Sequence, residues 1–262
     1  MPEKQNWDGE RIIPHAAFLD LPGDHVMRYL FAKKFVPGKV VLDAACGAGY
    51  GAKFLADNGT ELVIGVDISH DAIGFAKRSY AQDSLGFCVQ DVTNLAFPDK
   101  TFDVIVSFEA IEHIHDDKKY LRELARCLKA DGLCIISTPN KLVTSPIWKT
   151  PPNKWHIREY RPKELERILN IFFSQVLVQG EHVIDPKQKG LRSGYKVTTL
   201  IHPFFLHRLP QKIKDLYSDL LYGKERSSLG KKSNSYADYT IDDRDLIRSS
   251  VLIGVCRAPK CS

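Results

Sequence analysis

Proton-accepting side chains are concentrated in one short stretch of the chain. Glu109, Glu112 and His113 follow directly after an apolar run that predicts a strand, and His156 lies in a later loop. Carboxylate and imidazole groups at this density can remove a proton from a hydroxyl, or they can hold a divalent cation. Because ligands bind at the carboxyl ends of strands in open α/β sheets, this stretch predicts the reacting end of a ligand site.

A hydrophobic run that leads into a glycine turn is the strongest signal in the sequence. Residues 40–51 read VVLDAACGAGYG, with Gly47, Gly49 and Gly51 at alternate positions. This spacing differs from the G-x-G-x-x-G of dinucleotide sites, and Asp43 stands where a pyrophosphate would be repelled. An acid at this place suits a ligand with a cationic amino group instead.

Two further acids end the next two predicted strands. A carboxylate at the position of Asp67 can accept hydrogen bonds from both hydroxyls of a ribose, and Asp91 lies at the depth of an adenine edge. Three acids at three successive strand ends are hard to explain by packing. Together with the glycine turn, they predict a binding site.

The elements that position these residues follow from the pattern of apolar residues. Short β-branched runs alternate with helical periodicity from Lys39 to Pro139, which predicts a parallel sheet covered on both faces. We expect an α/β fold with a doubly wound, mostly parallel, seven-stranded sheet. The expected strands are 39–44, 62–67, 86–90, 103–108, 133–138, about 172–178 and 250–256, and the expected helices are 50–58, 70–80, 116–129 and one from about 162.

Four regions follow from this assignment. We expect an N-terminal arm and helix at 1–36, a core at 37–182, an insertion at 183–247, and the last strand and tail at 248–262. The insertion has helical spacing over 210–222 and a polar, basic stretch at 224–235. We expect it to cap the acceptor side and decide the substrate. Its apolar residues 204–206 offer a homodimer or membrane-surface contact as the alternative.

Composition narrows the class of protein. The 262 residues are 44% hydrophobic and 26% charged, which supports one large core. The six cysteines form no CxxC pair, so we expect reduced thiols and no zinc cluster. The net charge of +5 suits an anionic acceptor and falls short of that expected for a nucleic-acid binder. There is neither an apolar leader nor a run of membrane-spanning length, so we expect a soluble cytoplasmic protein.

The motifs resemble those of class I S-adenosylmethionine-dependent methyltransferases, which have a Rossmann-like fold. The similarity covers about residues 25–180 through VLDAACGAGYG, GVDIS, FDVIVSFEAIEHI and LKADGLCIISTPN. It implies S-adenosylmethionine as the cofactor, with roles for residues in three groups. By this resemblance the methionine part meets Asp43, Gly47 and Gly49, and the sulfonium lies near the backbone of Ser107 and Phe108. The ribose meets Asp67 and Ile68, and the adenine meets Asp91 and Val92.

Three further stretches resemble particular groups within this family. The helix from His25 to Ala32 is similar to one in polysaccharide-associated members; His25 or Arg28 there could meet the cofactor carboxylate or belong to a solvated helix face. Glu-x-x-Glu-His resembles metal-assisted O-methyltransferases that act on ubiquinone precursors or on RNA ribose. NKWHIREY, at 153–160, looks like sugar methyltransferases of surface-polysaccharide biosynthesis.

Two mechanisms remain open at the acceptor. In the first, Glu109, Glu112, His113 and His156 jointly hold Mg²⁺ or Mn²⁺; in the second, His113 is the general base and Glu112 orients its ring. The expected reaction is O-methylation of a saccharide, present as a nucleotide sugar, a lipid-linked glycan or a polysaccharide end. The alternatives are RNA ribose, a quinone-like phenol, or a catalytically silent scaffold. The basic stretch is confined to the insertion, which disfavours nucleic acid.

Overall fold

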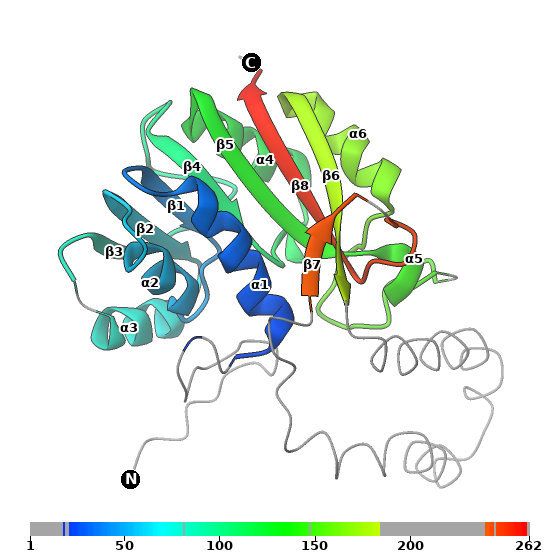
Figure 1. The fold of residues 1–262 in the computed structure, drawn as a ribbon, viewed down its shortest axis with the longest axis horizontal. Helices are drawn as coiled ribbons and strands as arrows, with labels where there is room; N and C mark the ends of the chain where they lie inside the picture. Colours follow the sequence, from blue (N-terminus) through cyan, green and yellow to red (C-terminus); the bar gives the residue numbers. More distant parts are fainter. Residues whose placement is uncertain are drawn as a thin grey trace, which may run out of the picture.

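One eight-stranded sheet organises the chain in the computed structural model, which describes residues 18, 21–80, 82–146, 148–183, 239–243 and 245–260. The strand order is β3-β2-β1-β4-β5-β8-β6-β7 (Figure 1). The strands are β1 (Val40–Ala44), β2 (Leu62–Asp67), β3 (Leu85–Val89), β4 (Phe102–Ser107), β5 (Leu128–Pro139), β6 (Phe173–Val183), β7 (Tyr239–Asp242) and β8 (Val251–Pro259).

The predicted α/β, Rossmann-like fold is confirmed, with one correction to the strand count. Strands β1 to β5 pair in parallel, and β8 lies antiparallel between β5 and β6. The eighth strand, β7, is formed by the end of the predicted insertion and pairs with the last residues of β6. Its four residues are too few to show a period in the sequence, so only the pairing with β6 reveals this edge strand.

Helices cover both faces of the sheet, as a doubly wound fold requires. One apolar cluster joins the sheet to the helices near the amino terminus, and a second joins it to α4 and α6. The helical segments are α1 (Gly23–Ala32), η2 (Lys33–Phe35), α2 (Tyr50–Ala56), α3 (His70–Ser79), η3 (Ile111–His113), α4 (Asp117–Cys127), α5 (Lys141–Thr144) and α6 (Pro162–Phe172).

Local chemistry sets the ends of these helices. The Ser69 hydroxyl accepts a hydrogen bond from a backbone N–H in the first turn of α3, and Asp116 caps α4 in the same way. Helix α4 ends at Cys127 rather than at 129, because Leu128 is already extended and pairs with Phe102 of β4. Helix therefore passes into strand with no connecting residue.

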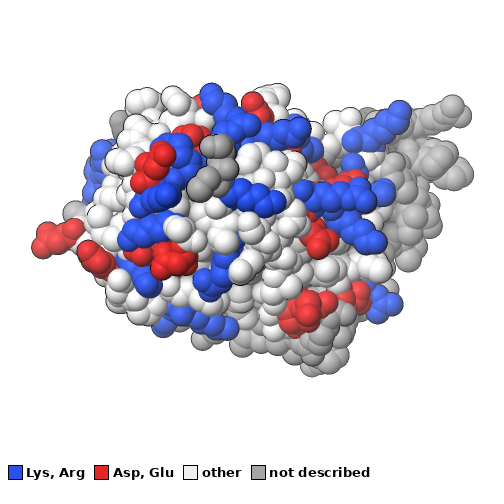
Figure 2. Space-filling model, turned by 90° about the horizontal axis from the view of Figure 1, so that it is seen from above, with Lys and Arg blue, Asp and Glu red and all other residues white. Residues whose placement is uncertain are grey.

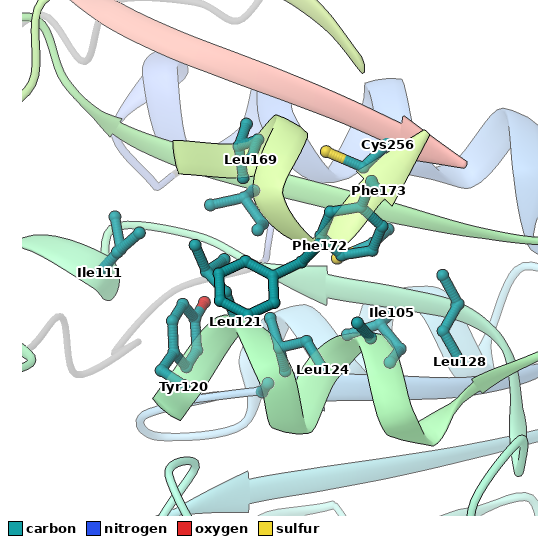
Figure 3. Packing of buried hydrophobic residues seen from close by; sticks show 14 of the residues in the cluster. Ile105, Ile111, Tyr120, Leu121, Leu124, Leu128, Leu169, Phe172, Phe173 and Cys256 are labelled. Carbon is teal, nitrogen blue, oxygen red and sulfur yellow. The ribbon is translucent and has the colours of Figure 1, made fainter. Parts of the chain in front are cut away.

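The core beneath α4 and α6 fixes these helices on the sheet. Figure 3 shows Tyr120, Leu121 and Leu124 of α4 facing Phe172, at the end of α6, across a packed apolar layer. Tyr120, Leu121 and Leu124 are fully buried. This packing sets the position of the turn between β4 and α4, where the proton-accepting residues lie.

Charges of both signs share the face at the amino ends of the parallel strands. In Figure 2 the Lys and Arg side chains spread over this face are interrupted by acidic and uncharged side chains. No helix among the described residues is long and apolar enough to cross a membrane. The segments 204–206, 210–222 and 224–235, for which we made predictions, lie outside the described residues.

Candidate active site

The glycine turn between β1 and α2 adopts the backbone that its sequence predicts. Ala45, Gly47 and Gly49 all have positive φ angles, of 63°, 54° and 80°. A Cβ at Gly49 would lie 2.7 Å from atoms of Ala76 and Phe87, whereas one at Gly47 would meet nothing within 4 Å. The turn is thus packed on its inner side at Gly49 and open to a ligand at Gly47.

Asp67, at the end of β2, holds this turn against the sheet. Its Oδ2 accepts a hydrogen bond from the Gly47 N–H at 3.0 Å, and its Oδ1 accepts one from the Ser69 N–H at 2.9 Å. The side chain is 6% exposed and lines a cavity. One carboxylate therefore shapes the turn and also presents an edge to the ligand space.

Two cavities meet at the carboxyl ends of the strands. The larger, of about 770 Å³, which we call the strand-end cavity, is lined by residues at or after the ends of β1, β2, β3 and β4, together with Trp155. The smaller, of about 260 Å³, which we call the helix-side cavity, is lined by α1, the glycine turn and the turn after β4. The residues that line both are Ala45, Gly47, Glu109 and His113.

Glu109 is held firmly where the two cavities meet. Its φ of 50° is a strained value for a residue with a side chain. Both its backbone and its side chain contact Ser137 of β5: the Glu109 N–H donates to the Ser137 carbonyl and hydroxyl, and the Ser137 hydroxyl donates to Glu109 Oε1 at 2.7 Å. Neighbouring strands thus fix this carboxylate.

Glu112 is completely buried beside His113. Its Oε2 accepts a hydrogen bond from the Thr138 hydroxyl at 3.0 Å, and its buried Oε1 has no hydrogen-bond partner. Burial, and then the charge of Glu109, raise the pKa of Glu112 well above its ordinary value. His113 Nε2 lies 4.0 Å from Glu112 Oε1.

The loop 153–160 is fastened onto the turn after β4. His113 Nδ1 contacts the Trp155 carbonyl at 3.0 Å, and because a carbonyl only accepts, Nδ1 carries the proton. The Ile157 N–H in turn donates to the Glu112 carbonyl at 2.8 Å. The neutral His113 ring therefore carries its proton-accepting lone pair on Nε2.

His156 lies against His113, with ring centroids 5.0 Å apart. Its Nδ1 is 2.8 Å from Glu159 Oε1, and its Nε2 is 2.9 Å from Asn153 Nδ2. Ligand atoms of Glu112, His113 and His156 lie within 4.8 Å of one another, close enough to share a cation. Glu109, the fourth residue of the predicted metal set, is not part of this group.

Arg28 of α1 is buried among carboxylates. Its Nη1 lies 3.2 Å from Glu181 and 3.6 Å from Glu109, and its Nη2 lies 3.7 Å from Asp24. Burial opposes the charge, but the carboxylates hold the pKa of Arg28 above its ordinary value. With 1% exposure Arg28 lines neither cavity, so the alternative of a solvated helix face is wrong for Arg28. Burial, and then the Arg28 charge, lower the pKa of neighbouring His25 to about 4.

Asp43, predicted to contact the cofactor, is buried beneath the surface of both cavities. The Tyr29 hydroxyl donates to its carboxylate at 3.1 Å, and the side chain is 1% exposed and lines neither cavity. Burial raises the pKa of Asp43 to about 7, and the charge of Asp67 adds to the shift. Its partner Tyr29 does line the helix-side cavity, so Asp43 is linked to that cavity by one hydrogen bond.

Most of the other predicted site residues do line the cavities. Ile68, Asp91 and Val92 join Asp67 in the strand-end cavity, where Ile68 is 66% exposed. His25, Phe108, Glu112 and His156 line the helix-side cavity. Ser107 is buried, and its hydroxyl donates to the Ala44 carbonyl.

Sequence reasoning missed the partners that hold these residues. Ser137, Thr138 and Glu181 come from β5 and β6, far along the chain from Arg28 and from the turn after β4. A clue is the run of polar residues in an otherwise apolar strand, Ser137-Thr138, which pattern analysis treated as the end of the strand. Glu181 gave no comparable signal.

Comparison with known proteins places this site in a family. Residues 42–136 match the family model described as "Methyltransferase domain". A Mycobacterium tuberculosis protein named "Probable S-adenosylmethionine-dependent methyltransferase" is 35% identical over 165 residues, 62% of this chain and 58% of its own length. The chain therefore spans less than two thirds of that relative. A ubiquinone biosynthesis O-methyltransferase of Coxiella burnetii is 31% identical over 158 residues, 53% of this chain and 66% of its own.

Solved structures agree on the fold. A possible histamine N-methyltransferase from Thermotoga maritima superposes with a TM-score of 0.59 over 90% of this chain and 89% of its own, at 14% identity. Phosphoethanolamine N-methyltransferase 2 from Haemonchus contortus, solved with S-adenosyl-L-methionine, gives 0.56 over 91% of this chain and 54% of its own, at 21% identity. At these identities the likeness concerns the fold alone.

Residues 42–136 form a methyltransferase domain, and over 62% of its length the chain is similar to a probable S-adenosylmethionine-dependent methyltransferase. The residues present fit that cofactor, because the backbone at Gly47 is open and the Asp67 carboxylate borders the same space. The exposed Ile68 side chain supplies an apolar surface that an adenine ring can cover.

Proposed function

We propose that this protein transfers a methyl group from S-adenosylmethionine to a hydroxyl of a saccharide acceptor. The observation that carries the proposal is His113, an imidazole on the wall shared by both cavities, with its Nδ1 proton held by a backbone carbonyl. A hydroxyl acceptor usually needs a base, whereas an amine does not need one in the same way. A base at this place therefore favours oxygen over nitrogen.

The chain's own residues would act on the acceptor proton. When bound, the cofactor supplies an electrophilic methyl group. His113 Nε2 accepts the hydroxyl proton as the acceptor oxygen takes the methyl group, and the contact with Trp155 holds the ring in that tautomer. Trp155, itself 41% exposed in the strand-end cavity, offers a flat face for a pyranose ring.

A cation is the second candidate for activating the hydroxyl. It would be held by Glu112, His113 and His156, whose ligand atoms converge, and the unpartnered Glu112 Oε1 favours this alternative. Mixed carboxylate and imidazole ligands suit Mn²⁺ better than Mg²⁺. Its chemistry would be to lower the pKa of the acceptor hydroxyl and to fix its direction.

One set of assays separates these mechanisms. Methyl transfer from tritiated S-adenosylmethionine would be measured on nucleotide sugars, lipid-linked glycans, catechols and short RNAs, before and after exhaustive chelation. We expect transfer to a saccharide. A full rate after chelation, combined with loss of the rate in His113→Ala, would support the base and reject the cation. The control is His70→Ala, which removes an exposed histidine at the start of α3.

Acceptors of another class would reject the saccharide proposal. Transfer to catechols or RNA alone would select one of the alternative substrates. Calorimetry tests the alternative of a catalytically silent scaffold. Binding of S-adenosylmethionine without methylation of any acceptor in the panel would favour that alternative. In the same experiment Asp67→Ala is expected to weaken binding by about 1–3 kcal/mol, since the ribose loses a charged hydrogen-bond partner.

The insertion remains part of the proposal as an acceptor-side cap, and the structure suggests how to test it. Val183 and Tyr239 are paired neighbours on β6 and β7. Residues 184–238 can therefore be replaced by a two-residue Asn-Gly turn without breaking the sheet. We expect this variant to keep cofactor binding and lose methyl transfer. Full activity would show that the segment does not select the substrate.

A further inference from the structure

The two cavities correspond in chemistry to the two halves of the cofactor. The strand-end cavity has the acids and the apolar side chain suited to an adenosine: Asp67, Ile68 and Asp91. The helix-side cavity is smaller and is bordered by His25 and Tyr50. In S-adenosylmethionine, the atom that joins the adenosine half to the methionine half is the positively charged sulfur.

With the cofactor bound across both cavities, residues that line both would lie near that joining atom. There are four such residues, and two of them, Ala45 and Gly47, have no ionisable side chain. His113 is the proposed base and is neutral in that role. Glu109 is the one carboxylate among the four. It is fixed through Ser137, and about a quarter of its side chain remains exposed.

The surroundings of Glu109 leave its negative charge only partly balanced. Among the residues that the structure describes, Arg28 is the cation that contacts it, and Arg28 also contacts Glu181 and Asp24. A second observation points to a ligand here: Glu112 Oε1, fully buried on the wall of the helix-side cavity, has no hydrogen-bond partner. A cationic ligand would complement the Glu109 carboxylate and give the buried Glu112 Oε1 a polar neighbour.

We propose that Glu109, held in place by Arg28 and Ser137, recognises the positive charge of the cofactor's sulfonium and so distinguishes S-adenosylmethionine from S-adenosylhomocysteine. The inference rests on the proposed function. Transfer of the methyl group leaves a neutral thioether, so the attraction to Glu109 is present before the reaction and absent after it. The same carboxylate then favours binding of the substrate form and release of the product form.

The test is a pair of affinities measured by calorimetry in the presence of a chelator. Glu109→Gln keeps the size of the side chain and removes its charge. We expect this variant to lower the affinity for S-adenosylmethionine about tenfold and the affinity for S-adenosylhomocysteine less than about threefold, since only the former loses a charged contact. The affinity for sinefungin, which carries an amine in place of the sulfonium, should fall as much as the affinity for S-adenosylmethionine. The control, Asp99→Asn, removes an exposed carboxylate that pairs with Arg126 and should change neither affinity.

Two results would overturn the proposal. Equal weakening of both ligands would place Glu109 near the methionine amino group or in a structural role, and no weakening of either would remove it from the site. Far-ultraviolet circular dichroism and a melting curve would show that the variant is folded. Failure of the unaltered protein to bind S-adenosylmethionine would instead reject the proposed function itself.

Discussion

Asp43→Asn should make the protein more stable at neutral and alkaline pH. Burial raises the pKa of the Asp43 carboxyl from its ordinary 3.8 to about 7. The folded chain therefore keeps a proton on Asp43 over a range of pH in which the unfolded chain has lost it. Each pH unit within that range lowers the free energy of unfolding by about 1.4 kcal/mol. From pH 4 to pH 7 the total is about 4 kcal/mol, as an upper value.

The groups around Asp43 allow a near-isosteric replacement to isolate this effect. The Tyr29 hydroxyl and a backbone N–H of α2 donate to the carboxyl, and Asp67 faces it from β2. An asparagine oxygen can still accept from Tyr29, so the variant loses the charge and keeps the contact. Stability that the original chain loses as pH rises through this range should be retained by the variant.

Urea unfolding at constant ionic strength, followed by circular dichroism at half-unit steps from pH 4.5 to 8.5, measures the difference. Other groups titrate in both proteins, and they cancel when the two curves are subtracted. The free energy of unfolding of the variant minus that of the original chain should rise towards pH 7 and then level off. Parallel curves for the two proteins would show that Asp43 is ionised in the folded chain and that the reasoning from burial is wrong.

Three further substitutions test the packing and the cofactor site. Gly51→Ala should destabilise by about 1–3 kcal/mol in thermal melts, because its Cβ would lie 1.9 Å from the Tyr29 ring; Gly74→Ala in α3 meets only a flexible side chain and should not destabilise. Asn140→Ala should lower the free energy of unfolding in urea by about 2–4 kcal/mol, since the Asn140 amide donates to two carbonyls of the segment before β8 and its oxygen caps α5. A decrease below about 1 kcal/mol would contradict this. Ile68→Ser should weaken S-adenosylmethionine about tenfold in calorimetry, by loss of apolar contact with the adenine; unchanged affinity would place the adenine elsewhere.

Much of the parallel half of the fold could be predicted from the sequence. Strands β1 to β4 start and end within about one residue of the predicted ranges, because buried parallel strands are continuous β-branched runs between clear turn signals. The antiparallel part was harder. β6 continues to Val183, through polar residues whose partners lie on β7 and β8. Such pairing is decided by contacts between distant segments and leaves no local pattern.

Which residues line the cavities could be predicted better than how deeply each one is buried. Residues that follow a strand do line the cavities, since their placement depends only on topology. Asp43 and Arg28 were expected at a ligand or in solvent, and both are buried with protein partners. Those partners, Tyr29 and Glu181, are recognised only once α1 is seen against the sheet.

The two ways in which segments join the sheet predict where the chain can change in length during evolution. Helix α4 runs into β5 at Cys127 and Leu128 without a spare residue, so an insertion there would displace Leu128 from its pair with Phe102 of β4. Between Val183 and Tyr239 the two ends already lie side by side, and added or lost residues leave the register untouched. Relatives should therefore vary widely in length after β6 and hardly at all after α4. The sheet can thus keep one cofactor chemistry while the segment after β6 diversifies.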